Sequence, residues 1–325
     1  MHLPCAQFPT MPFKVFNSTE NGIELLNLQE DGTLVSIVPK HGAMLHKFSI
    51  TTASGKHNVI DNYSSLEALE KELPMSFKSS KLSPFACRIP EGKYIYEGEV
   101  FEMTNKFIDG SAIHGLLYNK NFSVVNEFTD DLQASVLLKY NYKEEDDGYP
   151  FSYRCEIRYT LLPDNLLQLE TTIINLDDLP IPIADGWHPY FKLGGKVNDW
   201  LFQFNAGAMV EFDDRLIPTG HMLEYNHFNQ PTLIKELFLD NCFLLNDDDT
   251  YAACTIKNPQ NGLQVSFYPE ATYPFLQVYT PPHRESIAIE NLSAAPDAFN
   301  NKMGLLMLPA RHTHTFTVHY QLSCE

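Results

Sequence analysis

Apolar and polar side chains alternate with a period of two along much of this chain, and this alternation constrains the fold more than any other feature. It is clearest in four segments, at residues 136–142, 153–161, 263–267 and 316–322. Successive side chains of a β-strand point to opposite faces, so the pattern indicates strands with one face on a core and the other toward water. Turn dipeptides of the Asn-Gly or Asp-Gly type, which accept the positive φ of tight hairpins, punctuate the chain at 21–22, 31–32, 109–110, 147–148 and 261–262. The sequence therefore predicts an all-β, mainly antiparallel fold.

Helical periodicity is weak, and its best example is one short segment. Ser64 and Glu67 have the spacing of a capping box, and the leucines that follow share one helical face. We expect a helix over residues 64–73 that Pro74 ends.

No fixed-period repeat, low-complexity tract or flexible linker interrupts the 325 residues, of which 44% are hydrophobic. A chain of this length can bury about three quarters of its surface without disulfides or metals. Because β-sandwiches grow by adding strands to both sheets, we expect one domain over residues 1–325.

The chain is strongly acidic, with 23 Lys and Arg against 41 Asp and Glu and a formal charge of −18. This charge repels phosphate backbones and anionic membranes. We therefore expect neither nucleic acid nor a membrane as a partner, and a neutral small molecule is the simplest ligand. The acidic runs at 144–147 and 247–249 lack the ligand spacing of a calcium loop and are interpreted as solvated loops.

Features of exported or membrane proteins are missing from the sequence. No run approaches the roughly 20 apolar residues of a membrane span, and Pro4, Pro9 and Pro12 interrupt the region where a signal peptide would be apolar. The six cysteines form no Cys-x-x-Cys pair, which favours isolated reduced thiols. We expect a cytoplasmic protein that is a monomer or a weak dimer.

The first candidate for chemistry is His188, which lies among aromatic residues at 186–191. Pro189 restricts His188 to an extended backbone and so fixes the direction of its ring. A fixed imidazole can act as an acid, and the neighbouring rings suit the C–H face of a sugar. A core histidine stacked on aromatic side chains is the alternative, and this segment alone leaves both open.

Two further candidates are Glu290, at the end of the apolar run 286–289, and His114, which precedes Gly115 at a predicted strand edge. A glutamate in a buried strand needs a partner or a task; on the segment alone, the first residue of an exposed loop is the better interpretation. His114 can present its ring to a cleft, although most histidines in such places have no function.

Arg88 and Asp240 are single charges within apolar stretches. Arg88 is either a rigid donor fork for hydroxyl or carboxylate oxygens or one half of a structural ion pair. Asp240 either accepts hydrogen bonds from two sugar hydroxyls or caps a turn.

His312 and His314 are a candidate metal site, because they lie two residues apart on a predicted strand and so share a face. Without a third ligand at a matching spacing this pair is weak support, and we expect no metal. A phosphate loop, a dinucleotide fingerprint and a Gly-x-Ser-x-Gly elbow are also missing, so no cofactor is expected.

Taken together, these segments resemble the aldose 1-epimerase family, the galactose mutarotases. The resemblance rests on five motifs in the family's order, at Arg88-Ile89, Ile113-His114-Gly115, 187–193, Leu239-Asp240 and 287–290 with 296–300. It implies a large antiparallel β-sandwich of the galactose mutarotase-like supersandwich type, with few short helices and a sugar cleft across one sheet. It also implies anomer interconversion of free hexoses such as galactose or glucose.

The same resemblance implies a role for each residue. Glu290 would be the base that takes the proton of the anomeric hydroxyl, and His188 the acid that protonates the ring oxygen. His114, Arg88 and Asp240 would hold the sugar hydroxyls. Opening the ring needs one proton removed as another is supplied, which a carboxylate and an imidazolium achieve without a cofactor. We expect His188 to be protonated in the resting protein because Glu290 lies nearby.

Two positions depart from the family's pattern: Cys87, where many members have asparagine before the arginine, and Leu116, where a second glycine often follows the His-Gly pair. Three other functions are considered. A hexose-6-phosphate 1-epimerase would need cations at the phosphate, from Arg88 with Lys192 and Arg284. The others are a non-catalytic sugar-binding sandwich and a metal-dependent isomerase.

Overall fold

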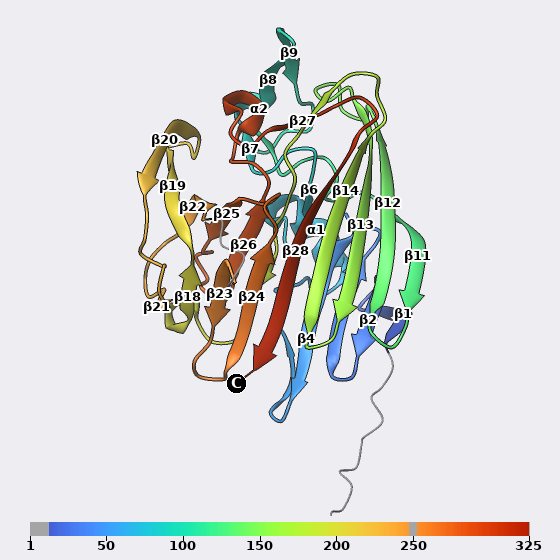
Figure 1. Ribbon diagram of the computed structural model, residues 1–325, viewed down its shortest axis with the longest axis vertical. Helices are drawn as coiled ribbons and strands as arrows, with labels where there is room; N and C mark the ends of the chain where they lie inside the picture. Colours follow the sequence, from blue (N-terminus) through green and yellow to red (C-terminus); the bar gives the residue numbers. More distant parts are fainter. Residues whose placement is uncertain (1–12, 247–251, 325) are drawn as a thin grey trace, which may run out of the picture.

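One layer of the molecule is a nine-stranded antiparallel sheet, seen in the foreground of Figure 1. The computed structural model describes residues 13–246 and 252–324. In spatial order the strands of this sheet are Ser123–Thr129 (β11), Ala134–Lys143 (β12), Ser152–Leu162 (β13), Leu166–Asn175 (β14), Thr313–Cys324 (β28), Leu263–Pro269 (β24), Cys254–Lys257 (β23), Leu201–Phe204 (β18) and Thr232–Leu233 (β21).

Two sheets pack against this layer. A five-stranded sheet comprises Lys14–Glu20 (β1), Ile23–Glu30 (β2), Thr33–Val38 (β3), Met44–Thr52 (β4) and Gly55–Asn58 (β5). An eight-stranded sheet comprises, in spatial order, Pro218–Glu224 (β20), Ala206–Phe212 (β19), Asp240–Leu245 (β22), Phe275–Tyr279 (β25), Ile287–Leu292 (β26), Gly186–Trp187 (β16) and Lys81–Leu82 (β6), with Tyr190–Phe191 (β17) also paired to β26. The predicted antiparallel β-sandwich is thus confirmed.

The remaining elements are short. Three two-stranded sheets pair Arg88–Ile89 (β7) with Ala112–Ile113 (β10), Lys93–Tyr96 (β8) with Glu99–Glu102 (β9), and Ile181–Ile183 (β15) with Leu306–Leu308 (β27). The helical segments are Leu66–Ser76 (α1), Pro90–Gly92, Val197–Asp199 and Ala298–Asn301 (α2). No helix among the described residues is both long and apolar enough to cross a bilayer.

The period-two alternation predicts the long strands correctly. In β13 all five alternating apolar side chains are buried: Tyr153, Cys155, Ile157, Tyr159 and Leu161. In β28 the same holds for Phe316, Val318, Tyr320 and Leu322. These side chains belong to one continuous core, which also includes Leu26 and Leu28 of β2, Val35 and Ile37 of β3, and Leu45 and Phe48 of β4.

The predicted helix exists, but its limits differ from those expected. Ser65, not Ser64, is the N-cap, and its hydroxyl accepts a hydrogen bond from the backbone N–H of Ala68. The helix also continues past Pro74 to Ser76 and ends at Phe77, whose backbone N–H donates to the carbonyl of Leu73. Pro74 lies in the last turn, where a missing N–H removes only one helical hydrogen bond.

Two expectations about loops and thiols can also be compared with the structure. The 144–147 run is not wholly solvated, because Asp146 is buried and accepts backbone hydrogen bonds from Thr104, Asn105 and Gly148. The five cysteines of the described residues are free thiols. Cys5, the three N-terminal prolines and the 247–249 run lie outside the described residues.

A buried ion pair joins the two main layers. Lys81 in β6 and Asp185 lie 2.5 Å apart (Nζ to Oδ1), and both side chains are fully buried. Lys81 Nζ also donates to the Thr171 hydroxyl of β14 at 3.2 Å, and the Tyr273 hydroxyl donates to Asp185 Oδ1 at 2.6 Å. Since Lys81 and Thr171 belong to different sheets, these contacts tie the eight-stranded sheet to the nine-stranded one.

Candidate active site

A cavity of about 240 Å³ lies on the outer face of the eight-stranded sheet. The direction follows from Asn291 of β26, whose side chain meets the Tyr320 hydroxyl of the nine-stranded sheet. Because neighbouring side chains of a strand point to opposite faces, Glu290 points away from that sheet and into the cavity. The residues that line it are Met75, Ser76, Phe77, Cys87, Arg88, Phe107, Ile113, His114, His188, Tyr190, Phe212, Leu216, Asp240, Gln277, Tyr279, Glu290 and Pro296.

The register of three neighbouring strands brings the acidic groups together. Gln277 of β25 lies opposite Glu290 of β26, and Tyr279 lies opposite Asp240 of β22. Residues two apart on a strand share a face, so Gln277 and Tyr279 both face the cavity. Gln277 Nε2 donates to Asp240 Oδ1 at 2.9 Å, which fixes the position of that carboxylate.

His188 lies between β16 and β17, and its backbone is held on both sides. Its N–H donates to the carbonyl of Ser80 at 3.1 Å, and its carbonyl accepts from the N–H of Ser79 at 2.8 Å. The imidazole stacks on Tyr190, with ring centroids 5.1 Å apart, and contacts His114 edge-on at 4.6 Å. The ring is therefore held in one direction, as the proline that follows it predicts.

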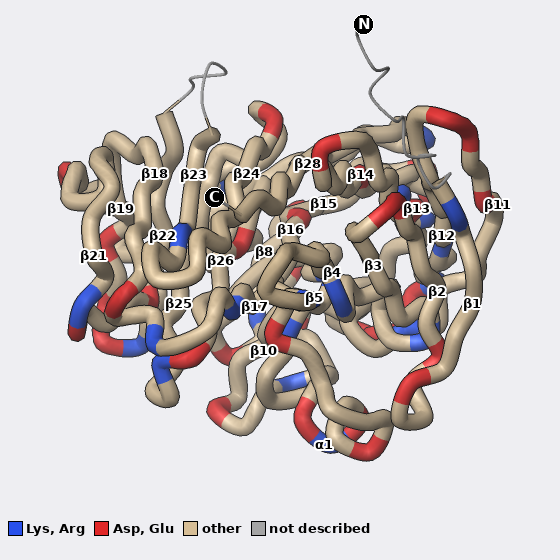
Figure 2. Tube along the Cα trace, turned by 90° about the horizontal axis from the view of Figure 1, so that it is seen from below, with Lys and Arg blue, Asp and Glu red and all other residues tan. Residues whose placement is uncertain are grey.

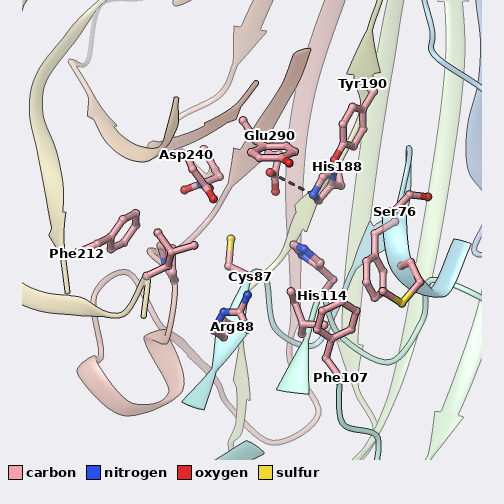
Figure 3. A pocket seen from close by; sticks show the side chains of 17 residues that line it. Ser76, Cys87, Arg88, Phe107, His114, His188, Tyr190, Phe212, Asp240 and Glu290 are labelled. Carbon is pink, nitrogen blue, oxygen red and sulfur yellow. Dashed lines mark hydrogen bonds and ion pairs between the residues drawn. The ribbon is translucent and has the colours of Figure 1, made fainter. Parts of the chain in front are cut away.

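His188 and Glu290 meet across the cavity, although 102 positions separate them in the sequence. His188 Nε2 lies 3.3 Å from Glu290 Oε1 (Figure 3). The two residues are 5% and 2% exposed. Glu290 is thus part of a buried strand, and the interpretation as the first residue of an exposed loop is wrong.

The electrostatics of this pair correct one expectation. Burial lowers the pKa of His188 to about 4. Burial, together with the carboxylate of Asp240, raises the pKa of Glu290 well above its usual range. The expectation of a protonated His188 in the resting protein is therefore wrong: removal from water opposes the charged imidazolium more than any group around it favours that form, and it favours a proton on Glu290.

His114 follows β10 in a left-handed backbone conformation, with φ of 59°. Its N–H donates to the carbonyl of Cys87 at 2.8 Å. The next residue must be glycine, because a Cβ on Gly115 would lie 2.4 Å from the carbonyl oxygen of Ser83. The His-Gly dipeptide thus has a steric reason, and it places the buried His114 ring against His188 and Phe77.

Arg88 and Asp240 face the cavity from opposite walls (Figure 3). Arg88 Nη1 pairs with Asp109 and donates to the Ser111 hydroxyl at 2.7 Å, so it is both a cavity residue and half of an ion pair. Burial raises the pKa of Asp240 to about 6, against the opposing effects of Arg88 and the hydrogen bond from Gln277. Asp240 is the first residue of β22, not a turn cap.

Four buried polar atoms of residues that line the cavity have no hydrogen-bond partner among the described residues: His114 Nδ1, His188 Nδ1, Gln277 Oε1 and Glu290 Oε2. Buried polar atoms ordinarily have partners. Their side chains line the cavity, so the hydroxyls of a ligand that enters it are one source of the missing partners. Phe212 and Tyr279 add aromatic surface against which the C–H face of a sugar can pack.

The structure brings all five predicted site residues into this one cavity, whereas other candidates lie elsewhere. Lys192 and Arg284 do not line it, and Arg284 donates to the carbonyls of Leu237 and Lys235. His312 binds the carbonyl of Ala310 through Nδ1, and His314 packs on Phe316.

Gln277 is the cavity residue that the sequence analysis missed. It lies on a short apolar strand, Phe275–Tyr279, and its side chain is 6% exposed. A single amide in a run of apolar residues was the available signal, of the same kind that identified Glu290 and Asp240.

The cavity also contains a possible set of metal ligands. His114, His188 and Glu290 each offer one ligand atom, and the three atoms lie within 4.8 Å of one another. Imidazole nitrogen and carboxylate oxygen are ligands that suit a first-row transition ion.

Comparison with known proteins gives a consistent picture. The sequence model described as aldose 1-epimerase matches residues 24–321. The uncharacterized protein YihR of Escherichia coli (strain K12) is 28% identical over 251 residues, which are 75% of this chain and 79% of YihR. The bifunctional protein GAL10 of Kluyveromyces lactis is 22% identical over 266 residues, covering 74% of this chain and 37% of that longer protein.

Solved structures share the fold over nearly the whole chain. A galactose mutarotase-like protein from Clostridium acetobutylicum superposes with a TM-score of 0.85 at 14% identity, covering 97% of this chain and 99% of that one. Galactose 1-epimerase from Lactobacillus acidophilus NCFM superposes with a TM-score of 0.77 at 20% identity, covering 98% and 99%. At these identities the likeness concerns the fold.

Proposed function

This chain belongs to the aldose 1-epimerase family, and from that premise we propose that it interconverts the α and β anomers of a free hexose such as galactose or glucose. The observation that carries the proposal is the 3.3 Å approach of His188 and Glu290 within a ligand-sized cavity. Glu290 and His188 are the catalytic residues of this proposal.

The reaction needs two coupled proton transfers. The Glu290 carboxylate takes the proton of the C1 hydroxyl while His188 gives a proton to the ring oxygen, and the bond between C1 and the ring oxygen breaks. The open-chain aldehyde rotates about C1–C2 and recloses with both transfers reversed. The pair holds one proton before and after ring opening, so no proton is exchanged with solvent.

The resting proton position fits one direction of this cycle. Protonated Glu290 and neutral His188 form the state that closes a ring, whereas opening a ring requires the proton on His188. They lie 3.3 Å apart, so a small approach of the two side chains brings them within hydrogen-bond range and lets the proton move between them. Sugar hydroxyls that hydrogen-bond to Glu290 would favour its charged form and so promote that shift.

Substrate binding is assigned to the groups around this pair. In the proposal, His114, Arg88 and Asp240 hold sugar hydroxyls, and Gln277 orients Asp240 and adds its free carbonyl oxygen as an acceptor. The volume of about 240 Å³ lies below the usual range of roughly 300–1,000 Å³ for ligand pockets. A monosaccharide suits this size.

The charges in the cavity favour a free sugar over a sugar phosphate. Among the described residues, the lining has one Lys or Arg side chain, Arg88, and that side chain is already paired with Asp109. Asp240 and Glu290 both face the same space. A phosphate group needs several cationic or N–H donors. Two carboxyl groups beside one arginine that is already paired with Asp109 do not provide them.

Polarimetry tests the proposal directly. Freshly dissolved α-galactose or α-glucose should reach its equilibrium rotation faster with the protein than in buffer. Glu290→Gln should reduce kcat by about 10²–10⁴-fold, the contribution of one positioned proton-transfer group, and still bind the sugar. Glu285→Gln is the matched control, because Glu285 is exposed and paired with Lys196 outside the cavity.

The outcomes separate the alternative functions. Sugar binding without faster mutarotation would indicate a non-catalytic sugar-binding protein. A higher kcat/KM for glucose 6-phosphate than for glucose would indicate the phosphosugar enzyme. Loss of activity on chelation would indicate a metal-dependent isomerase, whereas the two-group mechanism predicts full activity in chelator.

A further inference from the structure

The three residues at the centre of the cavity also have the composition of a transition-metal site. Two imidazoles and one carboxylate converge there from three separate segments, and their ligand atoms lie within 4.8 Å of one another. Zinc sites with an open position use three such ligands and leave a fourth place for water or another small ligand. All three residues line the cavity.

The spacing of one ligand pair already suits an ion. Zinc binds imidazole nitrogen at about 2.0–2.1 Å and carboxylate oxygen at about 2.0–2.2 Å, so two such atoms in a tetrahedral site lie roughly 3.4 Å apart. His188 Nε2 and Glu290 Oε1 lie 3.3 Å apart. With the ligand atoms of the cluster spread over at most 4.8 Å, closing around an ion needs a shift of little more than about 1 Å at the His114 ring.

The surroundings favour a cation and also limit how tightly it is held. Asp240 and Glu290 place two carboxyl groups at the cavity against the single guanidinium of Arg88, and Glu290 gives up its proton to solvent when it binds an ion. Ligating histidines usually donate their second ring N–H to a neighbouring acceptor. Here His114 Nδ1 and His188 Nδ1 have no partner in the protein, so the site suits a reversible ion better than a permanent one.

We propose that His114, His188 and Glu290 bind one Zn²⁺ or Co²⁺ ion, and that the bound ion excludes the sugar and thereby inhibits the protein. The metal-binding half stands on the geometry of the three side chains. The inhibitory half rests on the proposed function, because the ion would occupy both proton-transfer groups.

Titration of the metal-free, full-length protein with Co²⁺ tests the first half without any activity assay. Cobalt in a tetrahedral or five-coordinate site develops visible absorption bands, and we expect these to saturate at one ion per chain. Glu290→Gln, His188→Gln and His114→Gln should each weaken binding at least tenfold. His221→Gln is the matched control, since His221 forms an exposed pair with Glu211 at 3.1 Å and should not affect the bands.

Competition tests the second half. Galactose at ten times its own dissociation constant should raise the apparent dissociation constant for Zn²⁺ about elevenfold, because only the sugar-free protein binds the ion. In polarimetry, Zn²⁺ should raise the apparent KM for galactose, and chelator should restore the original value.

Several results would overturn the proposal. These are binding that survives Glu290→Gln and His114→Gln, binding lost in His221→Gln, no competition with galactose, or faster mutarotation on adding Zn²⁺. Saturable cobalt bands in a protein without mutarotase activity would reject the proposed function and leave the metal site standing. Mutarotase activity in a protein that shows no cobalt bands would reject the metal site and leave the proposed function standing.

Discussion

Glu290 and His188 together hold one proton, and burial sets the pH range over which they do so. Below about pH 4 His188 also becomes protonated, and the doubly protonated pair has no base. Above the pKa of Glu290, which is raised well above the usual carboxyl range, the pair loses its proton and has no acid. Because the two groups are coupled, the two apparent values belong to the pair.

We therefore expect a bell-shaped pH profile of kcat/KM for mutarotation. The acid limb should fall at about pH 4, and the alkaline limb should lie far above the pKa of an ordinary glutamate. Stopped-flow polarimetry or coupled oxidation of one anomer measures this. His188→Asn should lose the acid limb, and a wild-type profile with a single ionisation would contradict the two-group mechanism.

Asp240, a sugar-binding residue in the proposed function, carries a charge that is unfavourable for folding. Its pKa is raised by burial from 3.8 to about 6. A carboxyl whose pKa is higher in the folded than in the unfolded protein lowers the free energy of unfolding as the pH rises above the unfolded value. The destabilisation by Asp240 is therefore large at pH 7 and small at pH 4. One pKa unit corresponds to about 1.4 kcal/mol, and partial solvent screening reduces the total to about 1–2 kcal/mol.

Asp240→Asn should accordingly stabilise the protein and weaken its function. We expect the free energy of unfolding at pH 7 to rise by about 1–2 kcal/mol, little change at pH 4, and a higher KM for the sugar. Urea denaturation at the two pH values and polarimetry give these quantities. An equal change at both pH values would show that the buried charge is not the cause.

At the scale of the element, α1 brings Met75, Ser76 and Phe77 to the cavity, and its N-cap fixes where the helix starts. Ser65→Ala should cost about 1 kcal/mol of unfolding free energy, the usual effect of losing an N-cap hydroxyl. Ser64→Ala should change it by less than about 0.5 kcal/mol, because the Ser64 side chain is exposed. Thermal denaturation of both variants measures the difference, and a larger loss in Ser64→Ala than in Ser65→Ala would place the cap at Ser64.

The long strands could be predicted because each buries one face and exposes the other. The strands that carry the site give no such signal. Arg88 and the residues on either side of His188 lie on strands of two residues, which are too short to show a period. In β26 all six residues are buried, so the alternation that would have placed Glu290 on a face is absent.

The chemistry of the site could be predicted only as far as residue types and their order allow. The five residues expected from motifs share one cavity, but Gln277 was missed and the proton of the central pair was placed on the wrong residue. Both depend on neighbours brought in by strand pairing, as Gln277 is opposite Glu290 only through the β25–β26 register. The proton position depends on how much water the fold removes, which one-dimensional spacing does not contain.

At the scale of the whole molecule, acidic residues are spread around the periphery among fewer basic ones (Figure 2). A formal charge of −18 does not act on a neutral sugar, so kcat/KM for glucose should vary less than twofold from about 10 mM to about 500 mM salt. For glucose 6-phosphate it should be lower and rise with salt as repulsion is screened. A fall with salt would instead indicate a cationic phosphate subsite.

The buried pair of Lys81 and Asp185 makes the stability of each of the two main sheets depend on the other. Separating the sheets would strip the Lys81 ammonium of Thr171, and opening the eight-stranded sheet would leave one ion without its counterion, at a cost of about 3–5 kcal/mol. We therefore expect few partly unfolded states in which only one of the two sheets has opened. On heating or proteolysis, the cavity should therefore be lost together with both sheets in one cooperative transition.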